Sequence, residues 1–245
     1  MVLYNIPMNP ENKPREEQPN PEKNPEEISV REISLEDLDS LQPILEFWIK
    51  TPDTQETIHS EVDGVIESIK DSFSGNGDKK FYVAVDTEGS VLGMMGISKP
   101  SKEMIEFTKT GNAVEFINAY VDPKRRGLGV GKKLVISLEE EAKINGYEEI
   151  IVNSGPRYSQ TGWGFWTSVY GRPVAVQKDL YGPGLDAPVW QGFLGPNKKA
   201  RIDKQSEQGT LPTASLEKLL GKSNQVRGCL DRDIFDDNFL VMIEN

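Results

Sequence analysis

The fold is decided by one run, Val121-Asp122-Pro123-Lys124-Arg125-Arg126-Gly127-Leu128-Gly129-Val130-Gly131-Lys132. It places three glycines on alternate positions and basic side chains on both sides of them. Glycine lets backbone N–H groups approach a ligand without a Cβ in the way. The start of a following helix adds unpaired N–H donors and the positive end of a dipole. The run therefore predicts an anion cradle suited to a pyrophosphate.

The segments on either side of this run differ in their period. Residues 113–121 read as a β-strand, and residues 149–153 form a second, short and apolar strand. Between the run and the second strand, apolar residues recur at helical spacing up to the pair Asn145-Gly146, which favours a helix end. These apolar residues are Leu134, Val135, Leu138 and Ala142. Strand, glycine loop, helix and strand predict a crossover connection between neighbouring strands.

The elements outward from the crossover follow from the same patterns. A β-strand is predicted at residues 28–33. Two more are predicted at residues 81–85 and 91–97, and a turn at residues 87–90 joins these two into a hairpin. Two helices are expected between them. The first begins at Ser34, carries Leu35, Leu38, Leu41 and Leu45 on one face, and is expected to break or kink at Pro43; the second covers residues 58–73. Beyond the crossover, we expect a short helix at 162–168 and closing strands at 173–178 and 188–193 around the turn Tyr181-Gly182-Pro183-Gly184.

Composition divides the chain into three parts. Residues 1–28 are rich in Pro, Glu, Asn and Lys with almost nothing to bury, so this arm is predicted to be disordered. Residues 29–195 are predicted to form one domain. Residues 196–245 are a C-terminal extension with a helical pattern at 213–220 and a strand-like run at 239–243. No function follows for this extension, which is expected to dock on the domain or on a second copy in a homodimer.

Composition also excludes several classes of function. The formal net charge of −11 argues against nucleic acid as the main partner, because binding to a polyphosphate depends on clustered Lys and Arg. Cys229 is the only cysteine and His59 the only histidine, so no intrachain disulfide or Cys-rich metal site is expected, and we predict no metal. His59 is expected on a helix surface. No apolar run approaches the roughly 20 residues that span a bilayer, so we expect a cytoplasmic protein with no membrane partner.

Two known phosphate-binding patterns and one simpler structure are alternatives for the glycine run. A nucleotide P-loop fails, because Gly131-Lys132 is followed by Lys133 instead of Ser or Thr. A dinucleotide fingerprint has the wrong final glycine spacing, yet Glu148 or Glu149 lies near the distance expected of a ribose-binding acid, so this alternative stays open. A tight turn with solvent-facing basic residues is the simplest alternative.

The run resembles the acetyl-CoA loop of the GNAT N-acetyltransferase superfamily, whose motif is Arg or Gln, two residues, Gly, one residue, then Gly or Ala. Arg126, Gly129 and Gly131 match it, and residues 115–123 resemble the strand that precedes the loop in that family. The resemblance covers most of residues 29–194. It implies a mixed α/β (α+β) GNAT fold whose mostly antiparallel central sheet is flanked by helices. Two strands of that sheet splay apart, and the pantetheine arm lies in the gap.

The resemblance also implies which residues hold acetyl-CoA as co-substrate. The backbones of Ala119 and Val121 would hydrogen-bond the arm, while the amides of residues 126–132 would receive the pyrophosphate with added charge from basic side chains. The expected cofactor-binding set is Ala119, Tyr120, Val121, Arg125, Arg126, Gly127, Leu128, Gly129, Val130, Gly131 and Lys132.

Acetyl transfer to an amine needs a base, stabilisation of an oxyanion, and a proton for the thiolate. Glu115 lies where family members often carry a basic carboxylate; the alternative is a solvent-facing strand residue. A backbone N–H at about Val121 would polarise the thioester carbonyl. The usual proton-donating Tyr is replaced by Trp166, and an indole cannot donate that proton. Tyr170, Tyr158 or water would then substitute.

The sequence thus predicts an acetyltransferase acting on a small-molecule or peptide amine by direct attack. Overall acidity favours a cationic acceptor. Arg157 is a candidate for orienting an acidic acceptor, with an exposed salt bridge as its alternative role. Trp166 supports a different outcome, an acyl-CoA-binding or regulatory module that has lost turnover.

Overall fold

The computed structural model describes residues 27–75 and 77–195. In this part of the chain a seven-stranded sheet has the order β1-β2-β3-β4-β5-β7-β6. Only β4 and β5 are parallel, which confirms a mixed α/β fold with a mostly antiparallel sheet. The strands are β1 (Ser29–Glu32), β2 (Lys80–Val85), β3 (Val91–Ser98), β4 (Ala113–Val121), β5 (Glu149–Asn153), β6 (Ala175–Gln177) and β7 (Ala187–Phe193).

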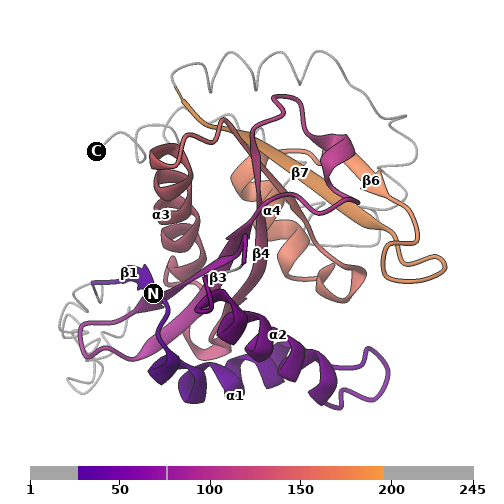
Figure 1. Ribbon diagram of the computed structural model, residues 1–245. Coiled ribbons are helices and arrows are strands. Elements are labelled where there is room, and N and C mark those ends of the chain that lie inside the picture. Colours follow the sequence, from indigo (N-terminus) through magenta and orange to yellow (C-terminus); the bar gives the residue numbers. More distant parts are fainter. Residues whose placement is uncertain (1–26, 76, 196–245) are drawn as a thin grey trace, which may run out of the picture.

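Helices cover both faces of this sheet (Figure 1). One face carries α1 (Leu38–Trp48) and α2 (His59–Ser72), and the other carries α3 (Val130–Ile144) and α4 (Gly162–Tyr170). Each face has its own apolar core. The strands β2, β3, β5 and β7 between the two cores are almost entirely buried, whereas the edge strands β1 and β6 are partly exposed. Four short 3-10 helices complete the described part: η1 (Leu35–Asp37), η2 (Ile105–Phe107), η3 (Pro123–Arg125) and η4 (Pro156–Tyr158).

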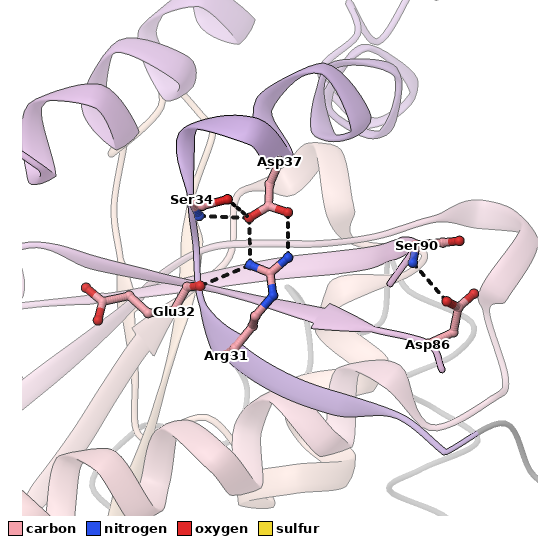
Figure 2. Close-up of polar contacts among 6 residues, drawn as sticks. All are labelled: Arg31, Glu32, Ser34, Asp37, Asp86 and Ser90. Carbon is pink, nitrogen blue, oxygen red and sulfur yellow. Dashed lines mark hydrogen bonds and ion pairs between the residues drawn. The ribbon is translucent and has the colours of Figure 1, made fainter. Parts of the chain in front are cut away.

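A polar cluster ties β1 to the start of the first helix. The guanidinium of Arg31 donates two hydrogen bonds of 2.7 Å to the carboxylate of Asp37, which also accepts from the backbone N–H of Ser34 at 2.7 Å. Figure 2 shows this arrangement, together with the bond from the Ser90 N–H to Asp86 that closes the β2–β3 turn. The hydrogen bonds from Arg31 are the main reason why the pKa of Asp37 is lowered. The chain therefore enters its first helix in a fixed direction.

One expectation for the first helix is wrong, and of the break or kink expected at Pro43 the break is excluded. Leu35 does not join Leu41 and Leu45 in the core, because it lies in η1 and is 58% exposed. The chain also does not break at Pro43, since α1 continues through it. Pro43 and Asp39 are both exposed, so water can satisfy the Asp39 carbonyl that loses its helical partner.

The crossover β4–α3–β5 forms as the sequence predicts, but the two strands pair over a short length. Their register runs from Ala113↔Glu149 to Glu115↔Ile151. Beyond Glu115, β4 continues beside β3 alone, while β5 continues beside β7. The two strands thus diverge toward the glycine loop, as the predicted splay requires.

A bulge in β4 sets the direction of its last residues. Met94 pairs with Tyr120 but Gly96 pairs with Ile117, so β4 contains one extra residue, and Asn118 has a φ of 51°. Asparagine tolerates this left-handed conformation better than most residues. The extra residue shifts the alternation of side chains, so Ile117 and Tyr120 pack on the same face, that of α1 and α2.

At its other end, β5 is anchored by Glu149, which is fully buried. Its carboxylate accepts hydrogen bonds from the backbone N–H groups of Lys109 and Thr110 and from the side chain of Gln191. Glu149 therefore fixes the loop before β4, and it is not placed to bind a ribose. This finding rules out Glu149 as the ribose-binding acid of the dinucleotide alternative and leaves the exposed Glu148 as its other candidate.

Several expectations lie outside the described residues. They include most of the 1–28 arm, the 196–245 extension with its helical and strand-like patterns, and Cys229. Within the described ranges, His59 is exposed at the start of α2 as predicted. In the same ranges no helix is long and apolar enough to cross a bilayer, and no three His, Cys, Asp or Glu side chains gather as metal ligands.

Candidate active site

The glycine loop follows β4 and opens the N-terminus of α3. Gly127 and Gly129 have φ values of 80° and 83°, a region that favours glycine, and a Cβ at either position would meet open space. Gly129 is the N-cap of α3 and has no side chain that could cap the first turn. The first N–H groups of α3 therefore face the loop as donors for an anion.

Tight packing explains the third glycine. A Cβ on Gly131 would lie 3.0 Å from the ring of Phe165, so this position lets α3 approach α4 closely. Of the basic side chains, Arg125 lies 3.8 Å from the carboxylate of Asp86. Lys132 is exposed. The loop thus combines positive charge with backbone donors at the point where β4 has left β5.

The last residues of β4 are held by α1, which lies on the face of the sheet opposite α3. The indole N–H of Trp48, at the end of α1, donates a 2.7 Å hydrogen bond to the carbonyl of Val121. The guanidinium carbon of Arg126 lies 5.4 Å from the centre of the Trp48 ring. Ala119 is exposed, although it lies within a strand. Sequence reasoning missed Trp48, because no local pattern relates a residue on a helix to a strand 73 positions away.

Glu115 lies at the last paired position before β4 and β5 diverge. Its side chain is only 7% exposed, so it is not a solvent-facing strand residue. Its carboxylate accepts a 2.7 Å hydrogen bond from the backbone N–H of Ser101. Burial raises the pKa of Glu115 above its usual value of 4.5, although the bond from Ser101 opposes this rise. A carboxyl group with a raised pKa at this position suits a general base.

The two tyrosines predicted as proton donors lie in different surroundings. Tyr170 donates a 3.1 Å hydrogen bond to Glu139 of α3, and its ring stacks on Trp166 at 6.1 Å. Burial raises the pKa of Tyr170 well above its usual value. Tyr158 instead packs edge-on against Trp48 and Tyr120, with ring centres 6.5 and 6.3 Å apart. Tyr158 is therefore at the end of β4, while Tyr170 is directed toward α3.

A third tyrosine, Tyr181, was missed. Its hydroxyl donates a 2.8 Å hydrogen bond to the side chain of Asn153, the last residue of β5, and burial raises its pKa to about 12. Its ring lies against Gly155, where a Cβ would be 3.1 Å away. The sequence marked Tyr181 only as part of a Gly-Pro turn. Its contact with β5 depends on the pairing of β5 with β7, which a turn pattern does not reveal.

Arg157 lies in η4, directly after β5. Its guanidinium donates hydrogen bonds of 2.8 and 3.1 Å to the two carboxylate oxygens of Glu61 on α2. It also lies 5.9 Å from the centre of the Tyr158 ring. The salt bridge, the simpler of the two roles considered for Arg157, is thus present.

Comparison with known proteins agrees with this geometry. The family model described as "Acetyltransferase (GNAT) family" matches residues 42–166. That range extends from α1 to α4 and includes β4, the glycine loop and β5. No curated protein matches the chain at a significant level.

Solved structures show the same fold at low sequence identity. A GNAT-family protein from Desulfovibrio desulfuricans has a TM-score of 0.55 and 17% identity, with 69% of this chain and 100% of that chain covered. YncA from Salmonella typhimurium, solved with acetyl-CoA, has a TM-score of 0.50 and 19% identity over 69% of this chain and 94% of its own. An aminoglycoside 6'-N-acetyltransferase complexed with coenzyme A has a TM-score of 0.50 and 16% identity over 69% and 98%.

Proposed function

Because the chain belongs to the GNAT acetyltransferase family, we propose that it transfers an acetyl group from acetyl-CoA to a primary amine by direct attack. The acceptor is a small molecule or a peptide. One observation carries this proposal: a loop with two glycines at positive φ opens the N-terminus of α3 at the point where β4 and β5 have separated.

The residues of the loop fit the diphosphate of acetyl-CoA. Open space at Gly127 and Gly129 lets the backbone approach a phosphate, and the first N–H groups of α3 are donors for its oxygens. Arg125, Arg126 and Lys132 add positive charge. The exposed edge of β4 at Ala119 would hydrogen-bond the pantetheine arm. Solved neighbours with coenzyme A or acetyl-CoA bound support this assignment.

Two residues of the chain would move protons during the reaction, and acetyl-CoA supplies the activated thioester. Glu115 accepts the proton that the amine loses as its nitrogen attacks the acetyl carbon, directly or through water. The N–H of Val121 stabilises the oxygen on which negative charge develops. The hydroxyl of Tyr158 supplies the proton that the departing sulfur takes. We assign this last role to Tyr158 over Tyr170, because the Tyr170 hydroxyl is bonded to Glu139.

Trp166 favours a second candidate function, a module that binds acyl-CoA without turnover. Its indole is buried, packs against Phe116 and Tyr170, and stands where the family usually has the proton-donating Tyr. Such a module would keep the loop that binds acyl-CoA and would lose only the acetyl-transfer step.

One experiment separates the two candidates. Release of the CoA thiol is followed with acetyl-CoA and a panel of primary amines, including diamines, amino acids and aminoglycosides. Amine-dependent thiol release supports the transferase. Tight acetyl-CoA binding with no release above the amine-free rate for any acceptor supports the binding module. A thermal-shift comparison of acetyl-CoA with NAD and ATP tests the remaining nucleotide alternatives.

A further inference from the structure

Three polar side chains lie on one face of the sheet where β4 and β5 separate. Glu115 on β4 pairs with Ile151 on β5, so these two side chains point to the same side, and so does Asn153, two residues further along β5. Both chain neighbours of Glu115 pack in the core beneath α3, so this side faces away from α3. The hydroxyl of Tyr181, from the loop between β6 and β7, reaches Asn153 at 2.8 Å.

The hydrogen bond between Tyr181 and Asn153 has a fixed direction. The amide nitrogen of Asn153 lies 3.2 Å from the sulfur of the buried Met104. Because a thioether accepts but cannot donate a hydrogen bond, the amide nitrogen belongs on that side and the amide oxygen faces Tyr181. The Tyr181 hydroxyl therefore donates its single proton to Asn153. Toward a ligand, its oxygen can act only as a hydrogen-bond acceptor.

Tyr181 is accessible and lies near the candidate base. The residue as a whole is 51% exposed, so a molecule from solvent can reach it. Burial around the hydroxyl raises its pKa to about 12, with contributions from Tyr158 and from the charge of Glu115. At neutral pH Tyr181 thus keeps the proton that it donates to Asn153. The effect of Glu115 on the hydroxyl means that the two oxygen acceptors are near each other.

A neutral primary amine matches these two acceptors. Its nitrogen carries two N–H groups and one lone pair, and the lone pair must point at the acetyl carbon. Glu115 and Tyr181 can each accept one N–H while the nitrogen attacks, which holds it in the reacting direction. A secondary amine has only one N–H, so its second substituent would meet the Tyr181 oxygen and leave that acceptor without a partner.

We propose that Tyr181 binds the acceptor amine and selects primary over secondary amines, with Asn153 as the positioning residue that orients its hydroxyl. This proposal rests on the proposed acetyl transfer and deepens it. As the nitrogen bonds to the acetyl carbon and the C–S bond breaks, one amine proton passes to Glu115, and the sulfur takes a proton from Tyr158. The other N–H stays on the product amide and remains bonded to Tyr181.

The test compares butylamine with N-methylbutylamine, which differ by one methyl group on the nitrogen. In Tyr181→Phe, the kcat/KM for butylamine should fall about fivefold, mainly through KM, because one hydrogen bond is lost. The value for N-methylbutylamine should stay nearly constant, and so should acetyl-CoA affinity. A purely structural role of Tyr181 would lower both amines by the same factor. Leu185→Ala changes an exposed residue of the same loop and should keep the wild-type preference.

Asn153→Leu tests the positioning role. Leucine is similar in size but cannot accept the Tyr181 proton, so the preference for butylamine should fall toward that of Tyr181→Phe. The double variant should show no further loss of preference, because both changes break the same unit. Losses of preference that add in the double variant would contradict the positioning role of Asn153.

A preference for butylamine that is unchanged in Tyr181→Phe, or an equal loss for both amines, would overturn the proposal. If the wild type turns over neither amine, the failure lies with the proposed acetyl transfer. Binding of N-butylacetamide and of its N-methyl derivative to the CoA-saturated protein then decides the question, since only the first has an N–H for Tyr181. An affinity about fivefold higher for the first, lost in Tyr181→Phe, supports the site, and equal or undetectable affinities refute it.

Discussion

Trp48 donates its indole N–H to the carbonyl of Val121 at 2.7 Å, across 73 residues of sequence. Val121 is the last residue of β4 and directly precedes the glycine-loop segment. The bond fixes the direction in which the chain leaves the sheet, and it comes from the helix layer on the face opposite α3. Together with the contact of Arg126 with the Trp48 ring, this bond joins α1 to the end of β4 at the candidate cofactor site.

Trp48→Phe tests this coupling. The ring is retained and the N–H is lost, so the Val121 carbonyl loses its side-chain donor. Because one such hydrogen bond contributes about 1 kcal/mol, acetyl-CoA affinity should fall about fivefold. Calorimetric titration measures the change, and Phe73→Leu, which removes an exposed ring at the end of α2, is the control with unchanged affinity. An unchanged affinity in Trp48→Phe would show that Trp48 does not position the loop.

Glu115→Gln tests the general base. The maximal rate should fall about 100-fold while acetyl-CoA binding is preserved, because the amide cannot accept the proton. In the wild type, the rate should rise with pH as Glu115 loses its proton, at a pH above 4.5 since burial raises its pKa. That dependence should be missing in the variant. Glu106→Gln removes an exposed carboxylate of η2 and should change neither rate nor pH profile. An active Glu115→Gln enzyme with an unaltered profile excludes Glu115.

A pair of Tyr→Phe variants tests the proton donor. Tyr158→Phe should lower kcat about 100-fold with acetyl-CoA affinity unchanged. Tyr170→Phe should keep its kcat and lose about 1–2 kcal/mol of stability, because its hydroxyl is bonded to the buried Glu139. Steady-state kinetics and denaturant unfolding measure the two effects. A rate loss confined to Tyr170→Phe would reverse the assignment.

The pair Arg31 and Asp37 predicts a pH-dependent stability. Hydrogen bonds from Arg31 lower the pKa of folded Asp37 below its usual 3.8, so this stabilisation is present above pH 3.8 and is lost as pH falls through the folded pKa. Asp37→Asn should cost about 1 kcal/mol at neutral pH, a low value because Arg31 is 45% exposed. Unfolding in urea at several pH values should show the difference shrinking in acid. Asp39→Asn, a change of the same kind at an exposed residue of α1, is the matched control.

Local patterns predicted the crossover well. Residues 113–121 and 149–153 become β4 and β5 with the predicted ends, because each is a strongly apolar strand beside a clear turn or glycine signal. Asn145-Gly146 also ends α3 as expected, with Gly146 at a φ of 81°. In these segments, periodicity and turn chemistry specify the same structure.

Features that depend on distant pairing could not be predicted. The bulge at Asn118 exists only relative to the register with β3, and it decides that Tyr120 shares a face with Ile117. The contact between Tyr181 and Asn153 depends likewise on the β5–β7 pairing. The glycine loop was therefore located from sequence, whereas the contacts of Trp48 and Tyr181 and the position of Tyr120 required the tertiary structure.

The most direct test of the account is a calorimetric titration of acetyl-CoA into the wild-type protein and into Gly129→Glu, with Gly146→Glu as control. Both glycines have a φ near 80°, so each variant should lose about 1 kcal/mol of stability through backbone strain. The account predicts saturable binding to the wild type and to Gly146→Glu, and no binding to folded Gly129→Glu. Absence of binding to the folded wild-type protein, or equal binding to all three, would contradict it.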